Sequence, residues 1–241
     1  MLNLLLTRHG NAAPGNLILG GRLDLPLTDA GRAEAGALRD RLAGIRIDRI
    51  IASPMARALE TARIVADGRP VEVDERLREL RYGEWEGLTH AEIESRDPEL
   101  WARWDADPAR TDPPGGECAD DVAVRVNAFL TDLLAAEAGP QPIATHHHST
   151  DPGGSRGEIS ESQAAIEGER RVLVVAHGTY NRILLCVALG VPVRDYRRRF
   201  IQDRAGLSVL RYEADDAPDG AQLVLANDVG HLRHPGEAPW G

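Results

Sequence analysis

Apolar residues gather in short runs along this chain, and two of the runs end in the same way. Residues 2–6 are apolar except for Asn3, and the polar cluster 7–10 (TRHG) follows them directly. Residues 171–176 (RVLVVA) lead into His177 and Gly178. A short apolar run that stops at polar residues and glycine is typical of a buried parallel strand. The pattern therefore predicts two strands that each carry a histidine at the carboxyl end.

The other periodic segments alternate between strands and amphipathic helices. Thr28 is placed to cap one helix, and Ser53 with Pro54 has the composition of a helix N-cap followed by the first helical residue. Further strands are predicted at 48–52, 71–73, 207–212 and 222–226, and helices at 30–42, 54–66, 118–138 and 179–190. Strands that alternate with helices in this way predict an α/β fold with a parallel sheet.

Three segments do not fit that alternation. Residues 77–93 mix charged and aromatic side chains with glycines, which indicates a loop over a site, and residues 97–111 are expected to form short helices of a lid. Residues 141–168 are polar and predict a surface insertion or a flexible loop. Its three adjacent histidines, 146–148, either bind a transition metal or are solvated, and no structured fourth ligand is evident nearby.

Composition narrows the class of protein. A chain of 241 residues with 42% hydrophobic and 27% charged residues is long enough for one α/β domain with a sizeable core. The net charge of −10 argues against a nucleic-acid or membrane partner. Cys118 and Cys186 supply neither a disulfide framework nor a metal pattern. No signal peptide and no membrane-spanning run of about eighteen apolar residues is found, so a cytoplasmic location is expected.

Polar residues at the expected carboxyl ends of strands supply the candidate chemistry. Arg8 and His9 follow the first strand, Arg57 lies in the first turn after the second, and His177 follows a later one. Each of them alone is also compatible with a solvated arginine or a packed histidine. Together they form a pocket for a tetrahedral dianion, because arginine presents forked donors to phosphate oxygens. Glu79, in the loop above, is the acid placed to donate a proton.

This set of residues suits phosphoryl transfer. Neutral His9 can attack phosphorus through one ring nitrogen while a hydrogen bond on the other nitrogen selects the tautomer. The arginines and a protonated His177 would stabilise the charge of the transition state. Glu79 would protonate the leaving oxygen and later activate water.

Six segments in this order resemble the histidine phosphatase (phosphoglycerate mutase-like) superfamily, phosphatase branch. They are TRHG (7–10), GRLDLPLTDAG (21–31), SPMARALETA (53–62), LRELRYGEWEG (77–87), PGGE (114–117) and VVAHG (174–178). The resemblance implies a three-layer α/β/α sandwich with a mixed, mostly parallel sheet in one domain, 1–241. It also implies a helical cap over residues 77–138 and a polar surface insertion over residues 139–170.

The resemblance also implies roles for individual residues. His9 would be the phosphorylated nucleophile, with Arg8, Arg57 and His177 completing the phosphate pocket and Glu79 donating the proton. No metal and no cofactor are implied.

Three positions depart from the family pattern. Asn11 follows RHG where the family usually has Glu or Gln, and Cys118 follows PGGE where Ser is common. Many members place a phosphate-contacting asparagine six residues after the nucleophile. Here Asn16, seven residues after His9, is the candidate for that role.

The resulting prediction is a metal-independent phosphatase that hydrolyses small phosphorylated metabolites and releases inorganic phosphate. A cofactor-dependent phosphoglycerate mutase is the alternative, although Arg103 and Arg110 are the few basic residues that segment 101–114 offers to a second phosphate or carboxylate. A non-catalytic phospho-ligand binding module and a metal-dependent hydrolase also remain open. The family resemblance allows a homodimer.

Overall fold

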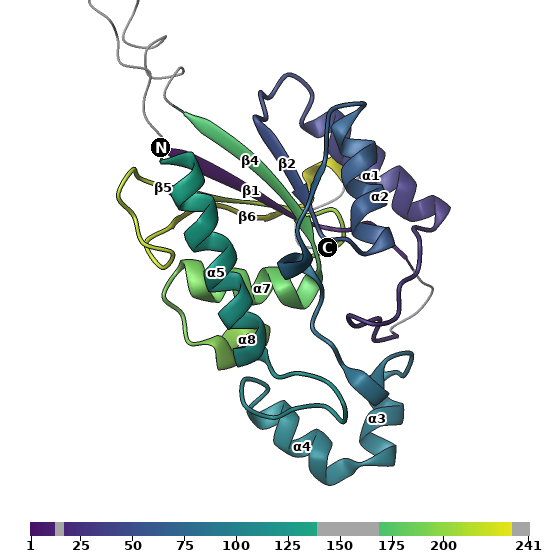
Figure 1. Cartoon of the computed structure of the whole chain (residues 1–241). Coiled ribbons are helices and arrows are strands. Elements are labelled where there is room, and N and C mark those ends of the chain that lie inside the picture. The colour runs from purple at the N-terminus through teal and green to yellow at the C-terminus, as the bar shows by residue number, and fades with distance from the viewer. Residues whose placement is uncertain (13–16, 139–168, 233–241) are drawn as a thin grey trace, which may run out of the picture.

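In the part of the chain that the structure describes, one mixed six-stranded sheet carries helices on both faces (Figure 1). The computed structural model describes residues 1–12, 17–138 and 169–232. The strand order is β3-β2-β4-β1-β5-β6. The strands are β1 (Leu2–Arg8), β2 (Arg49–Ala52), β3 (Glu72–Val73), β4 (Arg170–Ala176), β5 (Leu207–Tyr212) and β6 (Gln222–Asp228).

The directions of the strands decide which strand ends lie together at each edge of the sheet. Strand β1 is parallel to β4, which is parallel to β2, and β2 is parallel to β3. Strand β5 is antiparallel to β1, with Thr7 opposite Leu207, and β6 is antiparallel to β5. The carboxyl ends of β1, β2 and β4 therefore share one edge with the beginning of β5. The predicted α/β class with a mixed, mostly parallel sheet is confirmed.

Helices form two layers around this sheet, as the three-layer prediction requires. In Figure 1, α1 and α2 lie on one side of the sheet and α5 and α7 on the other. The helices are α1 (Asp29–Arg41), α2 (Ala56–Ala66), α3 (His90–Arg96), α4 (Pro98–Ala106), α5 (Ala119–Glu137), α7 (Gly178–Ala188) and α8 (Tyr196–Arg199). Short 3-10 turns lie at Glu75–Leu77, Gly83–Trp85, Val193–Asp195 and Gly230–Leu232.

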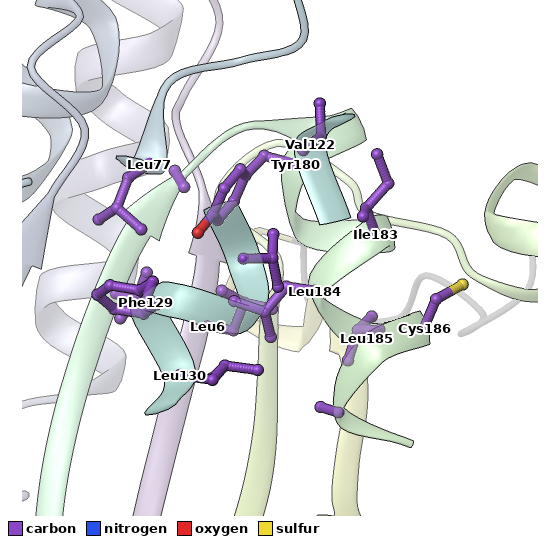
Figure 2. Packing of buried hydrophobic residues seen from close by; sticks show 14 of the residues in the cluster. Leu6, Leu77, Val122, Phe129, Leu130, Tyr180, Ile183, Leu184, Leu185 and Cys186 are labelled. Carbon is purple, nitrogen blue, oxygen red and sulfur yellow. The ribbon is translucent and has the colours of Figure 1, made fainter. Parts of the chain in front are cut away.

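Successive side chains of β1 point to opposite faces of the sheet and belong to two separate hydrophobic clusters. Leu4 and Leu6 belong to the cluster that includes the apolar faces of α5 and α7, whereas Leu5 belongs to the cluster with α1 and α2. Figure 2 shows Leu6 beside Leu130 of α5 and Leu184 of α7. Because successive strand residues point to opposite faces, a run of apolar residues can be buried on both faces of a central strand.

Helix starts agree with the sequence in one case and differ in another. Thr28 caps α1 as predicted, since its hydroxyl accepts a hydrogen bond from the Gly31 N–H at 3.1 Å. The prediction that Ser53 caps the second helix is wrong, because α2 begins at Ala56 and Met55 is its N-cap residue. The Ser53 hydroxyl instead lies 2.8 Å from His177 Nε2.

The predicted cap segment 77–138 contains two different parts. Helices α3 and α4 stand beyond the sheet, whereas α5 runs along the sheet beside α7 (Figure 1). Helix α3 lies partly within the predicted loop 77–93 and begins with a capping box between Thr89 and Glu92. That T-x-x-E pattern is the sequence signal for the helix.

Some predictions fall outside the residues that the structure describes. These include most of the polar insertion, with its histidines 146–148, whereas Arg170 already belongs to β4. A single domain over 1–241 stays a prediction. In the described ranges, no helix combines the length and the apolar content that crossing a bilayer requires.

Candidate active site

His9 lies at the point where β1 leaves the sheet. Its backbone N–H donates to the Ala176 carbonyl at 3.0 Å, which ties the residue to the end of β4, and its side chain is buried. Gly10 then passes close to α1, where an added Cβ would come within 2.4 Å of the Gly31 carbonyl oxygen. Only glycine allows the chain to turn against the helix at this distance.

Two contacts define the state of the His9 imidazole. Nδ1 lies 2.7 Å from the Gly10 carbonyl oxygen, which only accepts hydrogen bonds, so Nδ1 carries the proton. Arg57 Nε donates to Nε2 at 3.2 Å, which assigns the lone pair to Nε2. Burial, together with the positive charges of Arg57 and Arg8, holds the pKa of His9 well below its ordinary value. The ring is therefore neutral, with its proton on Nδ1 and its lone pair on Nε2.

Arg57 joins the histidine to the loop before α1. Its guanidinium is 1% exposed, and besides His9 it donates to the Leu23 carbonyl at 2.9 Å and to the Gly20 carbonyl at 2.8 Å. Burial lowers the pKa of Arg57, while the charges of Glu79 and Asp24 oppose that shift. The side chain thus fixes the loop across one side of the site and remains a cation.

Arg8 lies on the other side of His9 with part of its donor capacity unused. Its Nη1 donates to the Gln202 carbonyl at 3.0 Å, whereas its buried Nε has no hydrogen-bond partner within the described parts of the chain. Burial lowers the pKa of Arg8 to about 10, so the guanidinium stays charged near neutral pH. Gly178 makes room for it, since an added Cβ would lie 3.1 Å from Arg8 Nε.

His177 packs against His9 from the end of β4. The two ring centroids are 5.2 Å apart with the rings at 62°, and His177 Nε2 lies 2.8 Å from the Ser53 hydroxyl. Burial and the charge of Arg57 hold the pKa of His177 well below its ordinary value. The ring is therefore neutral without a bound anion, and a protonated His177 in the transition state stays a prediction. A dianion would shift that pKa in the opposite direction.

Glu79 is held at the start of α7, although it belongs to the segment that precedes the cap helices. Its Oε2 accepts from the Thr179 N–H at 3.0 Å, and its Oε1 accepts from the N–H groups of Tyr180 at 3.0 Å and Leu80 at 2.9 Å. These three backbone donors fix the carboxylate, which is 8% exposed. A helix N-terminus favours a negative group at this place.

The structure brings four of the predicted site residues into one cleft. Arg8, His9, Arg57 and Glu79 line a cavity of about 460 Å³, and the apolar segment 17–19 forms another part of its wall. His177 does not line the cavity and lies behind His9. Asn16, the remaining candidate, lies outside the described residues.

Comparison with known proteins assigns the family. A model of the histidine phosphatase superfamily (branch 1) matches residues 4–150 and 157–228. The chain belongs to this superfamily. It is 34% identical over 196 residues to a glucosyl-3-phosphoglycerate phosphatase of Mycolicibacterium vanbaalenii, covering 80% of this chain and 76% of that one.

Two other relatives extend the comparison. A probable phosphoglycerate mutase of Enterobacter is 29% identical over 242 residues, covering 98% of this chain and 97% of the other. A solved structure of a mycobacterial glucosyl-3-phosphoglycerate phosphatase with VO3 is 28% identical, with a TM-score of 0.72. That match covers 93% of this chain and 98% of the other. Within the superfamily, the relatives of this chain thus include proteins named as phosphatases and one named as a probable mutase.

Sequence reasoning missed several residues of this histidine phosphatase cleft. Arg182 of α7 and Arg204, which precedes β5, both line it, as do Asp203, Thr179 and Tyr82. Two positional signals were available. A residue four positions after Gly178 lies one turn along α7, and a residue just before a strand antiparallel to β1 lies at the edge where β1 ends.

Residues that could hold a metal lie elsewhere. Ligand atoms of Asp112, Cys118 and Asp121 come within 4.8 Å of one another at the start of α5. Cys118 Sγ already contacts an Asp121 oxygen at 3.3 Å, as part of a capping box. None of the three is among the described residues that line the cleft. The helix cap explains the contact between Cys118 and Asp121, and we assign the group no part in the reaction.

Proposed function

We propose that this protein is a metal-independent phosphomonoesterase that works through a phosphohistidine on His9. The observation that carries the proposal is the state of the His9 ring, with Nδ1 hydrogen-bonded to the Gly10 carbonyl and Nε2 deprotonated beside Arg57. A neutral imidazole with its tautomer selected in this way is prepared for attack on phosphorus. Family membership and the phosphatase relatives support the same reaction.

In the first step, the Arg57 Nε–H leaves His9 Nε2 for a phosphoryl oxygen, and the freed lone pair of Nε2 attacks the phosphorus of the ester. The Nε2–P bond forms while the bond from phosphorus to the ester oxygen breaks, and the leaving oxygen takes a proton from Glu79 in its carboxylic acid form. Arg8 and Arg57 are both guanidiniums beside the nucleophile, where they stabilise the negative charge on the phosphoryl oxygens. His177 gains a proton when the dianion binds and adds a third cation behind His9.

In the second step, water attacks the phosphohistidine. The Glu79 carboxylate accepts a proton from this water while the new P–O bond forms and the N–P bond breaks, which returns His9 to its neutral state and releases inorganic phosphate. The backbone N–H groups of Thr179, Tyr180 and Leu80 keep Glu79 in one position for both steps. One carboxyl group therefore serves as acid and then as base.

The substrates are proposed to be small phosphorylated metabolites. The sugar-phosphate and phosphoglycerate classes named by the relatives are the first to test, including glucosyl-3-phosphoglycerate, and α-ribazole phosphate follows. A cofactor-dependent phosphoglycerate mutase is the alternative, which the Enterobacter relative favours. A cytoplasmic location and a homodimer stay predictions.

Product analysis separates the two reactions. The purified protein, with and without a chelator, is given aryl phosphates and a panel of phosphorylated metabolites, and both inorganic phosphate and isomerised phosphate esters are measured. We expect phosphate release that is insensitive to the chelator and that falls by several orders of magnitude in His9→Ala. Isomerisation of 3-phosphoglycerate that needs a bisphosphate would establish the mutase instead. Loss of activity on chelation would overturn the metal-independent mechanism.

A further inference from the structure

Two arginines line the cleft without a part in the proposed phosphoryl transfer. Arg182 comes from α7 and Arg204 from the segment before β5, and both face the cavity that contains Arg8 and His9. The cap arginines Arg103 and Arg110, by contrast, are absent from the described lining of the cleft. The positive charge available to a second anion therefore comes from the α/β body of the molecule.

Arg204 is positioned by the backbone and carries an unpaired charge. It forms an isolated parallel bridge with Arg8, and the next residue, Ala205, donates its N–H to the Arg8 carbonyl at 3.0 Å. Its guanidinium has no hydrogen bond or ion pair with any side chain or carbonyl that the structure describes. Its charge nevertheless reaches the reacting groups, since it lowers the pKa values of Arg8 and His9.

Arg182 is held against the wall of the same cleft. Its Nε donates to the Gly178 carbonyl at 3.0 Å, and its guanidinium carbon lies 5.3 Å from the centroid of the Tyr196 ring. A guanidinium stacked on an aromatic ring loses little further conformational freedom when it binds an anion. The side chain is therefore preorganised for that purpose.

The acidic side chains that line the cleft offset only part of this positive charge. Glu79 is occupied by three backbone N–H groups, and Asp203 Oδ2 accepts from Asn227 Nδ2 at 2.8 Å. Both carboxylates keep their negative charge, because their hydrogen-bond donors are neutral, but four arginines outnumber them in a chain whose net charge is −10. An excess of cations in one cleft is unfavourable unless an anion binds among them.

We infer that Arg182 and Arg204 bind a second anionic group of the substrate. The preferred substrates are then phosphomonoesters that also carry a carboxylate or a second phosphate. The transferred phosphoryl group lies at Arg8, His9 and Arg57, while the second anion lies at the outer pair. This inference rests on the proposed phosphatase function and specifies its substrate class.

The test uses esters that differ in the second anion. For 3-phosphoglycerate and for glycerol 3-phosphate, which lacks the carboxylate, kcat/KM is measured and compared, and 2,3-bisphosphoglycerate supplies a second phosphate. We expect the native protein to prefer at least one of the two esters that carry a second anion. The preference is the ratio of kcat/KM for the doubly anionic ester to kcat/KM for glycerol 3-phosphate. In Arg204→Gln this ratio falls roughly 10- to 100-fold, the range for a lost hydrogen bond to a charged group, and the change lies mostly in KM.

Two variants serve as controls. Arg198→Gln removes the same charge from an exposed position of α8 and leaves the preference unchanged. Arg204→Lys keeps the charge but not the forked donors, and it restores part of the preference. An equal loss for all three esters in Arg204→Gln would overturn the inference, because Arg204 would then act only through its field on Arg8 and His9.

Binding measurements separate this inference from the proposed function. The dissociation constants of the same esters are measured by calorimetry for His9→Ala with and without Arg204→Gln, so that turnover plays no part. Tighter binding of a doubly anionic ester that depends on Arg204 supports the second anion site, even if the reaction proves to be a mutase. If His9→Ala abolishes turnover but Arg204→Gln changes neither affinity nor preference, the phosphatase proposal stands and this inference is wrong.

Discussion

Arg57 Nε lies 3.2 Å from His9 Nε2, the atom to which the proposed mechanism assigns the attack on phosphorus. The same guanidinium donates through its two terminal nitrogens to the carbonyls of Leu23 and Gly20. It therefore orients the proposed nucleophile, anchors the loop across the site and supplies positive charge beside His9. One side chain connects the packing of that loop with the electrostatics of the reaction.

Replacing Arg57 is expected to damage catalysis far more than the loss of a surface charge would. Arg57→Ala should lower kcat/KM for an aryl phosphate by roughly 10²- to 10³-fold, as for the loss of one preorganised donor in an active site. Arg57→Lys should recover little, since one ammonium group cannot replace a fork that contacts His9 and two carbonyls. Circular dichroism and thermal unfolding check the fold, and near-native activity of a folded Arg57→Ala would contradict the assignment.

The loss of kcat/KM on replacing Glu79 should increase with the basicity of the leaving group. Glu79→Gln can no longer donate a carboxylic acid proton, so hydrolysis of an alkyl phosphate should fall by roughly 10²- to 10⁴-fold. p-Nitrophenyl phosphate, whose leaving group needs no proton, should be affected much less. The measurement is kcat/KM over a series of esters. Equal slowing across the series would exclude Glu79 as the proton donor.

Anion binding should be coupled to proton uptake at His177. Its pKa lies well below the ordinary value because of burial and nearby cations, so the ring is neutral near pH 7. A bound dianion favours the protonated ring, raises that pKa and draws a proton from solvent. Sulfate is the probe, because it is a tetrahedral dianion that does not itself titrate at this pH.

Calorimetry in buffers of different ionisation enthalpy measures the number of protons that the protein takes up when sulfate binds. The observed enthalpy of sulfate binding should increase with the ionisation enthalpy of the buffer, with an uptake of at most one proton. His177→Asn should abolish the dependence. Unchanged uptake in that variant would mean that another group, with His9 as the first to examine, takes the proton.

Two glycine substitutions should affect different properties, the activity in Gly178→Ala and the stability in Gly36→Ala. In Gly178→Ala the new Cβ would lie 3.1 Å from Arg8 Nε and 3.2 Å from its Cζ, so the guanidinium must shift and kcat/KM should fall by about tenfold or more. Gly36→Ala, in the interior of α1 with nothing within 4 Å of the new Cβ, should stabilise the fold by about 0.5–1 kcal/mol. Its activity should not change. Thermal unfolding and aryl phosphate kinetics measure both, and native activity in Gly178→Ala would argue against close packing around Arg8.

Much of the framework could be predicted from local sequence. The apolar runs of β1 and β4 are buried on both faces, and this pattern located the strands and the two histidines that follow them. The apolar periodicity of α5 was equally informative, since this helix begins and ends within one residue of the predicted boundaries. These features depend on neighbours in sequence, which is why they could be found without coordinates.

The rest depends on contacts between distant segments. Ser53 looks like a helix cap, but the return of β4 beside β2 brings His177 to its hydroxyl, and the helix starts later. Arg204 looks like a surface residue until β5 pairs antiparallel with β1 and brings it beside Arg8. The neutral state of His177 likewise follows from burial and charges that only the assembled site supplies.

Trapping the phosphoryl group tests the central claim most directly. Turnover is stopped with base, in which phosphohistidine survives, and the modified residue is located by tandem mass spectrometry, while phosphorus magnetic resonance distinguishes the two ring nitrogens. The account predicts a phosphoryl group on Nε2 of His9 that is absent from His9→Ala. Steady turnover with no phosphohistidine, or a phosphoryl group on another residue, would contradict it.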